Sequence, residues 1–234
     1  MASRNCFSGL NIVLKLGGHL LFREEVDVSL LREYTSLLSE LFDGGRWVVV
    51  VGGGDVARKY VSAARRLGLD EATCDELAIQ TTRIHAGLLA RALGELACQK
   101  VPTTVDEIRY LSEMGRVVVS GGLQPGQSTM AVSVLAAAVT GAERIVVATD
   151  VDGIYTSDPK KDPEARIIPR MKFEELAGLA ANVSQRAGDY QVADAVGVSL
   201  LLRTRIPLYY VNGERVEMVR EAILGRKAGT IVSD

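Results

Sequence analysis

Short runs of β-branched residues alternate with helical stretches along most of the chain, and this alternation limits the folds available to it. The runs are near-continuous in Val and Ile, as in "VVVV" at residues 48–51, and not alternately polar and apolar. Such runs are typical of strands buried on both faces of a parallel sheet. The strands expected from them are residues 11–16, 46–51, 116–120, 144–149 and 207–211, with residues 229–233 as a further strand at an edge.

The segments between these runs have apolar residues at the spacing of amphipathic helices. The expected helices are residues 27–45, 55–68, 75–97, 129–141, 173–180, 190–204 and 214–225, the first of them ending at Gly44 and Gly45. Strands that alternate with helices indicate an α/β fold with a largely parallel sheet covered on both faces. Since no composition shift or linker interrupts the pattern, we expect one domain over residues 1–234.

Composition and charge exclude several classes of protein. The formal net charge is −2, whereas a nucleic-acid binder would usually be clearly basic. No window approaches 18 uninterrupted apolar residues, so we expect neither a membrane span nor a signal peptide. Cys6, Cys74 and Cys98 are far apart and do not combine with His19 or His85 at zinc-site spacing. Free thiols in a reducing cytosol are therefore expected, and with them a cytoplasmic protein.

Four unusual segments follow predicted strands. They are Gly17–Gly18, Gly52–Gly54, residues 121–129 ("GGLQPGQST") and residues 150–159 ("DVDGIYTSDP"). In open α/β sheets, ligands sit beyond the carboxyl ends of the strands, and glycine lets the backbone approach a ligand closely. Four such segments on one edge predict an extended binding site.

The stretch "VVVVGGGDVARKY" matches the letters of a dinucleotide-binding fingerprint. Gly52, Gly54 and Ala57 fit G-x-G-x-x-G/A, and Asp75 lies at about the spacing of the ribose-binding acid. In that motif, however, the acid ends a strand, whereas no strand pattern precedes Asp75 and a helical pattern follows it. The required βαβ context is missing, which argues against NAD.

The segment "GGLQPGQST" matches part of a Walker loop. Gly121, Gly126 and Ser128 fit G-x-x-x-x-G-K-[ST], but Gln127 stands where the Walker lysine belongs. That lysine compensates much of the phosphate charge. A Walker nucleotide loop is therefore not expected, although the segment can still offer N–H groups and hydroxyls to a phosphate or a base.

Positive charge lies close to the glycines. Lys15 closes the apolar strand "NIVLKL", and a lysine there is costly to bury unless an anion meets it. Arg58 lies in the first turn or so of the helix after Gly54. Both residues are therefore candidates for binding an anion.

Taken together and in order, the motifs of the chain resemble those of archaeal-type uridylate (UMP) kinases, a branch of the amino acid kinase superfamily. The matching segments are "LKLGGHLL", "VVGGGDVARKY", "DELAIQTTRIHA", "SGGLQPGQSTMAV" and "VVATDVDGIYTSDPKKDPEARIIPRM". The resemblance implies a three-layer α/β/α sandwich around a mostly parallel sheet. It also implies transfer of the ATP γ-phosphoryl group to UMP with Mg²⁺, without a Walker loop.

The resemblance assigns roles residue by residue. Lys15 and Arg58 would be catalytic, and ATP would be bound by Lys15, Gly17, Gly18, Gly54, Arg58, Thr149, Asp150, Tyr155 and Asp158. UMP would be bound by Gly53, by Asp75 through its ribose hydroxyls, and by the loop of Leu123, Gln124, Pro125, Gly126, Gln127, Ser128 and Thr129. No protein metal ligand is assigned.

Two residues depart from the family pattern. His19 stands where many relatives have a small Ser, and it is open whether it is a phosphate ligand, a proton-sensitive variant or a neutral substitution. Asp150 replaces a common Asn, and "TDVDG" occurs in other branches, including isopentenyl phosphate kinases. A sister kinase for another small phosphate, or a non-catalytic nucleotide-binding paralogue, therefore stays as an alternative.

The family resemblance also implies a homohexamer built as a trimer of dimers. The helix expected over residues 75–97 is a candidate interface, and a buried core helix is an equal alternative.

Overall fold

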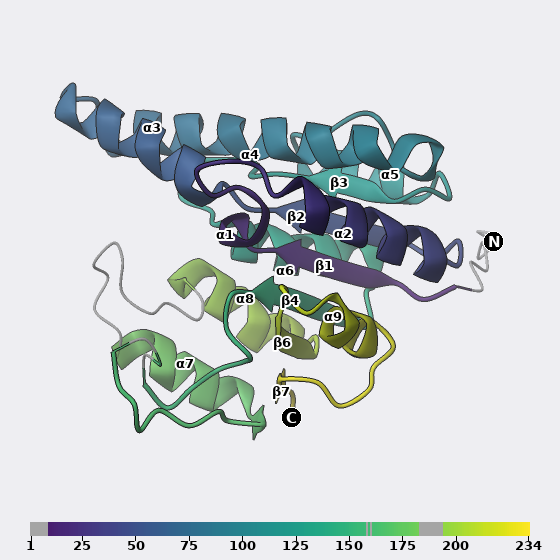
Figure 1. Ribbon diagram of the computed structural model, residues 1–234, viewed down its shortest axis with the longest axis vertical. Helices are drawn as coiled ribbons and strands as arrows, with labels where there is room; N and C mark the ends of the chain where they lie inside the picture. Colours follow the sequence, from purple (N-terminus) through teal and green to yellow (C-terminus); the bar gives the residue numbers. More distant parts are fainter. Residues whose placement is uncertain (1–8, 158, 160, 183–193) are drawn as a thin grey trace.

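The computed structural model describes residues 9–157, 159, 161–182 and 194–234 of the chain. Seven strands of the described residues form one sheet in the order β3-β2-β1-β4-β6-β7-β5, parallel except where β6 meets β7 (Figure 1). The strands are β1 (Ile12–Leu16), β2 (Trp47–Val51), β3 (Val118–Ser120), β4 (Arg144–Thr149), β5 (Arg170–Met171), β6 (Leu208–Asn212) and β7 (Thr230–Val232).

Helices cover both faces of the sheet. They are α1 (Gly18–Leu21), α2 (Val28–Leu41), α3 (Gly54–Arg66), α4 (Glu71–Leu93), α5 (Val105–Ser112), α6 (Thr129–Thr140), α7 (Phe173–Asn182), α8 (Ala195–Thr204) and α9 (Val216–Ile223), with a 3₁₀ turn at Gly94–Leu96. One core cluster joins alternate strand residues to α2, α4 and α9, and the other joins the remaining strand residues to α5, α6, α7 and α8. This confirms the predicted α/β sandwich of three layers.

The strand order places a topological switch in the middle of the sheet. From β1 the chain builds outward through β2 and β3, then returns to the other side of β1 with β4 and β6. Crevices beyond the carboxyl ends of strands at such a switch are the usual binding sites of open α/β sheets. The segments that follow β1, β2 and β4 therefore meet at one edge.

Several predicted boundaries were wrong, each for a local reason. Helix α2 ends at Leu41 and not at Gly44 and Gly45, because Asp43 accepts from the N–H groups of Leu10 and Gly45 and holds a turn there. Strand β7 is not an edge strand, because β5 pairs with its outer side. The short elements α1, α5 and β5 had no predicted counterpart. Among the described residues, no helix is long and apolar enough to cross a membrane.

Candidate active site

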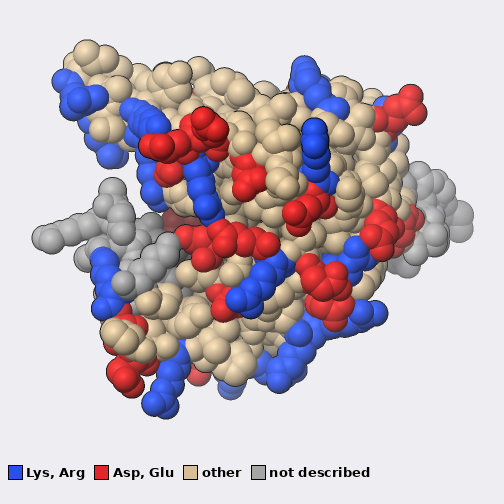
Figure 2. Space-filling view, in the orientation of Figure 1, with Lys and Arg blue, Asp and Glu red and all other residues tan. Residues whose placement is uncertain are grey.

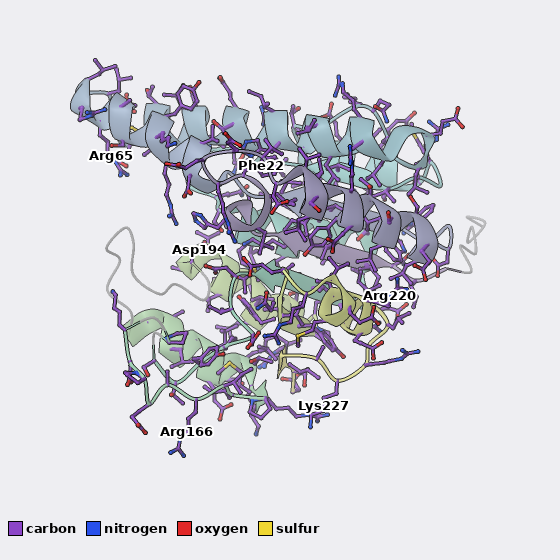
Figure 3. The ribbon with its side chains drawn as sticks, viewed as in Figure 1. Phe22, Arg65, Arg166, Asp194, Arg220 and Lys227 are labelled. Carbon is purple, nitrogen blue, oxygen red and sulfur yellow. The ribbon has the colours of Figure 1, made fainter. Side chains whose placement is uncertain are left out.

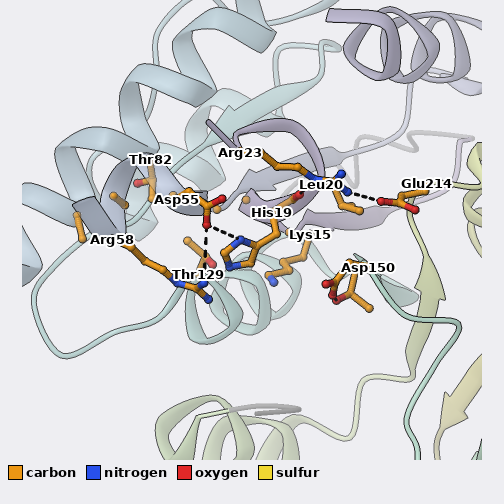
Figure 4. A pocket seen from close by; sticks show the side chains of 18 of the residues that line it. Lys15, His19, Leu20, Arg23, Asp55, Arg58, Thr82, Thr129, Asp150 and Glu214 are labelled. Carbon is orange, nitrogen blue, oxygen red and sulfur yellow. Dashed lines mark hydrogen bonds and ion pairs between the residues drawn. The ribbon is translucent and has the colours of Figure 1, made fainter. Parts of the chain in front are cut away.

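A cleft of roughly 940 Å³ opens at the carboxyl ends of β1, β2 and β4 (Figure 4). This size is typical of small-molecule sites. Of the residues assigned a catalytic or binding role from the sequence, the cleft is lined by Lys15, Gly17, Gly18, Gly53, Gly54, Arg58, Thr129, Thr149 and Asp150. Four chain segments far apart in the sequence are thereby brought to one place.

The glycine turns after β1 and β2 pack directly against each other. A Cβ on Gly18 would lie 2.0 Å from the Gly54 nitrogen, and a Cβ on Gly52 would lie 2.6 Å from the Gly18 nitrogen. Gly54 has a φ of +59° and would clash with the Phe22 carbonyl oxygen at 2.1 Å if it carried a Cβ. These positions must therefore be glycine so that the two turns can pack together, as well as to let a ligand approach. The packing requirement was not predicted from the sequence.

A buried histidine supports the second glycine turn from α4. His85 Nδ1 lies 3.1 Å from the Gly52 carbonyl oxygen, and the ring stacks on Phe22 with centroids 3.6 Å apart. Burial lowers the pKa of His85, while the Gly52 contact acts in the opposite direction. The neutral ring therefore donates Nδ1–H to Gly52, which is a structural role.

Lys15 projects from β1 toward the face covered by α6 and α8. It pairs in register with Val50 and Val147, which belong to the core on that face. Burial lowers the pKa of Lys15, and the carboxylates of Asp150 and Asp194 raise it in part. A half-buried ammonium that is open to the cleft and influenced by two carboxylates is suited to an incoming anion.

Asp194 was missed in the sequence, where it was placed inside a helix expected over residues 190–204. It is the N-cap of α8 and accepts from the Gly197 N–H at 3.0 Å (Figure 3). It also accepts from the Ser128 hydroxyl. An Asp directly before the apolar run "AVGVSLLL" is an N-cap signal that could have located this helix start. The effect of Asp194 on Lys15 is long-range and has no sequence signal.

A charged cluster lies at the start of α3 (Figure 4). Asp55 Oδ1 lies 3.1 Å from His19 Nδ1 and 3.8 Å from Arg58 Nη1. Nearby, Arg23 forms an ion pair with Glu214, and its Nε donates to the His19 carbonyl at 2.8 Å. Asp55, Arg23 and Glu214 line the cleft but were not predicted from the sequence.

Helix α4 holds the loop over residues 121–129. Asp75 Oδ2 accepts from the Gly126 N–H at 2.8 Å, and Thr82 Oγ1 accepts from the Gly122 N–H at 2.7 Å. Arg83 donates to the carbonyls of Gly122 at 3.0 Å and Leu123 at 2.8 Å. Asp75 lies one turn before Ala78, which lines the cleft. Asp75, the predicted ribose ligand, is therefore hydrogen-bonded to the predicted acceptor loop.

The residues of this loop differ in what they can offer. The Leu123 side chain is buried in the core, and the Ser128 hydroxyl caps α6 by accepting from the N–H groups of Met130 and Ala131. The side chains of Gln124 and Pro125 are exposed, Gln127 is half-buried, and Gly126 turns with a φ of +79°. Within the loop, only Thr129 lines the cleft.

The predicted adenosine residues are brought together only in part. Thr149 and Asp150 line the cleft directly after β4. Tyr155 lies outside the residues that line it, in a bridge with Ile167. Asp158 lies outside the described residues.

Charges elsewhere are mixed. Figure 2 shows acidic and basic side chains interspersed over one face of the molecule, with no broad surface of one sign.

In the part of the chain that the structure describes, no group of three or more His, Cys, Asp or Glu side chains is placed to hold a metal ion.

Comparisons with known proteins point in one direction. The model of the amino acid kinase family matches residues 11–212. A protein of Hyperthermus butylicus named uridylate kinase is 40% identical over 95% of this chain and 97% of its own length. A uridylate kinase of Methanothrix thermoacetophila is also 40% identical, over 94% and 97%. The crystal structure of uridylate kinase from Archaeoglobus fulgidus superposes with a TM-score of 0.86 at 34% identity, covering 96% of this chain and all of that one.

Proposed function

The chain belongs to the amino acid kinase family, and from that premise we propose that it transfers the γ-phosphoryl group of ATP to UMP. The products are UDP and ADP, and the reaction serves pyrimidine nucleotide synthesis. The relatives that cover nearly the whole chain are named uridylate kinases, which supports this assignment over other phosphate acceptors.

The observation that carries the proposal is the position of Lys15, half-buried at the switch point of the sheet, in a cleft shared with the glycine turns and the start of α3. The first N–H groups of a helix have no partner within it and attract anions. Phosphoryl transfer requires little covalent help, but it requires two anionic substrates held in line with charge compensation at the moving group. Lys15 and Arg58 supply that charge from two sides of the cleft.

The acceptor side is supported by the loop that α4 holds. A carboxylate can accept two hydrogen bonds from a cis-diol, and Asp75 has acceptor sites beyond the one bonded to Gly126. The polar loop of residues 124–129 offers fixed donors and acceptors to the imide N–H and carbonyls of uracil. ATP would bind in the part of the cleft that Thr149 and Asp150 line.

Mg²⁺ would enter with ATP. Mg²⁺ is usually held by substrate phosphates, waters and one or two carboxylates, and seldom by an all-protein cage. The cleft fits this mode, because it is lined by few carboxylates, those of Asp55, Asp150 and Glu214, and Asp55 and Glu214 are already paired with His19, Arg58 and Arg23. When bound, the ion would neutralise phosphate charge, and we assign it no protein ligand.

We propose a homohexamer in the cytosol. Helix α4 is a core helix on one face, where Ala86, Leu89 and Ala90 are buried. On another face Ile84 and Leu88, one turn apart, are 72% and 41% exposed. Helices α3 and α4 run along one edge of the molecule (Figure 1), where a second copy can cover them. Cys74 and Cys98 are free thiols, as expected in a reducing compartment.

A coupled ADP-release assay over UMP, CMP, dUMP and isopentenyl phosphate tests the acceptor. We expect turnover of UMP to exceed that of the others. Isopentenyl phosphate belongs in the panel because "TDVDG", which contains Asp150 of the cleft, also occurs in isopentenyl phosphate kinases. Turnover of another acceptor without UMP would contradict the proposal, and tight ATP binding without any turnover would support a non-catalytic paralogue.

A further inference from the structure

A carboxylate lies where the proposed function requires anions to bind. Asp55 is in the first turn of α3, its N–H donates to the Phe22 carbonyl at 2.9 Å, and its side chain lines the cleft. Left uncompensated, this charge would repel a phosphate and compete with it for the helix start and for Arg58. The structure must therefore neutralise Asp55 when a phosphate is present.

His19 is the group placed to do so. Its Nδ1 lies 3.1 Å from Asp55 Oδ1, so the ring donates Nδ1–H to the carboxylate. Its Nε2 is then the nitrogen directed away from Asp55, and in Figure 4 the ring lies between the ends of the Arg58 and Lys15 side chains. In the neutral ring Nε2 has a lone pair and cannot donate to a phosphate, whereas in the imidazolium it carries a proton and can.

We propose that His19 and Asp55 form a proton-coupled phosphate ligand, in which His19 takes up one proton when the phosphoryl group to be transferred enters the cleft and then donates Nε2–H to it. This inference rests on the proposed kinase function. It assigns His19, which departs from the family pattern, a role in binding the moving group.

The electrostatic environment favours a neutral ring before binding. Burial lowers the pKa of His19, and the Arg58 guanidinium lowers it further, while Asp55 and Asp150 act in the opposite direction. Lys15 also lines the cleft, and Arg23, which touches the His19 backbone, is neutralised by Glu214. A phosphate dianion adds negative charge next to Nε2 and so favours the imidazolium.

The proton balance is simple. The proton comes from solvent as the phosphate enters, no bond of the protein breaks, and the proton returns to solvent when the product leaves. Asp55 already contacts the Arg58 guanidinium, and it gains a second cationic partner, the protonated His19 ring, only in the loaded state. Phosphate binding is thereby linked to proton uptake.

Calorimetry measures this uptake directly. The Mg²⁺ complex of the non-hydrolysable imido analogue of ATP is titrated into the full-length protein, with UMP present, at pH 7 in buffers of different ionisation enthalpy. The wild type should take up at least about half a proton more per analogue bound than His19→Asn. Titration of the analogue's own phosphate is common to both proteins and cancels in the difference.

Two further variants separate charge from structure. His19→Lys supplies a fixed positive charge, so it should retain activity within about tenfold while losing the proton uptake and the associated pH dependence. Asp55→Asn keeps an acceptor for Nδ1–H but removes the charge that favours protonated His19, so it should shift the alkaline limb of the kcat/KM profile for ATP to lower pH. Lys59→Ala, an exposed change on α3, should match the wild type in uptake and pH profile.

The outcomes are distinct. Equal proton uptake by wild type and His19→Asn would overturn the proposal, as would an unchanged pH profile in Asp55→Asn. Absence of UDP formation by the wild type would count against the proposed function instead, since the binding calorimetry does not depend on turnover.

Discussion

At the scale of single residues, the cleft is built from charges that are unfavourable until a ligand arrives. Lys15 carries a half-buried, partly desolvated ammonium beside core valines, and the carboxylates of Asp150 and Asp194 offset that cost only in part. The structure tolerates it because the strand around Lys15 is held on both sides by β2 and β4. Function and stability therefore oppose each other at this position.

Lys15→Met should separate the contribution of Lys15 to catalysis from its effect on stability. We expect kcat to fall roughly 100- to 1,000-fold, with a smaller change in KM for UMP, because a charge on the moving phosphoryl group is lost. The melting temperature should rise, because Met fills similar space without a desolvated charge. Steady-state ADP release and thermal unfolding measure both; activity within threefold of the wild type would contradict the catalytic role.

Asp75→Ala should weaken binding of the acceptor, UMP. We expect KM for UMP to rise about tenfold or more, because both the ribose contact and the Gly126 N–H bond are lost, with little change in KM for ATP. Glu76→Ala, an exposed carboxylate next to it on α4, is the matched control and should leave both unchanged. An effect on ATP alone would refute the ribose assignment.

His85 should make stability depend on pH. Its pKa is lowered in the folded state, so the native ring stays neutral while the unfolded chain binds a proton below its ordinary pKa of about 6.5. Stability is therefore lost as pH falls through that range. The melting-temperature advantage of the wild type over His85→Gln should shrink between pH 7.5 and 5.5, and a constant difference would show that His85 does not titrate there.

At the scale of elements, two glycine turns act as one unit. Gly18 belongs to the turn after β1, and Gly52 and Gly54 belong to the turn after β2, yet their backbones approach closer than any side chain permits. Since β1 and β2 are parallel neighbours, their carboxyl ends are adjacent, and small residues let the turns interlock. This contact places the starts of α1 and α3 at the same cleft.

Gly18→Ala tests the contact. The added methyl would meet backbone atoms of Gly52 and Gly54, which cannot yield as a flexible side chain can, so we expect a destabilisation of about 1–3 kcal/mol and loss of activity. Gly178→Ala on α7, where a Cβ meets nothing within 4 Å, should be neutral or slightly stabilising. Denaturant unfolding compares the two, and equal stability of both variants would contradict the interlocking of the turns.

At the scale of the whole molecule, topology decides where chemistry occurs. The order β3-β2-β1-β4-β6 reverses direction between β1 and β4, so Lys15 and Asp150 face one crevice. Helices α3 and α4 line the cleft through other residues, whereas the exposed apolar side chains of Ile84 and Leu88 on α4 are not among those that line it. Catalysis and assembly would therefore use separate surfaces.

Ile84→Glu should weaken assembly. A charge on the exposed face of α4 would be buried without a partner in the proposed interface, so light scattering should show a smaller particle than the wild type. Val28→Glu, a comparably exposed apolar position on α2, is the control and should leave the mass unchanged. Unchanged assembly of Ile84→Glu would remove α4 from the interface.

Much of the fold follows from local pattern. Val and Ile runs located β1, β2, β4 and β6 to within one residue at each end, because strands buried on both faces need such runs wherever they lie. Motifs in order identified the family, and the strand ends located the cleft. The short elements α1, α5 and β5 were missed because so few residues give little periodicity.

The sequence by itself determined the class of fold, the family and the segments that border the site. Only the tertiary structure decided that Gly18 packs on Gly54, that the charge of Asp194 acts on Lys15, that His85 holds Gly52 and that His19 pairs with Asp55. Strand and helix patterns are local, since they arise from spacings of two to four residues. These pairings depend on which strands become neighbours in the sheet, and no spacing along the chain encodes that.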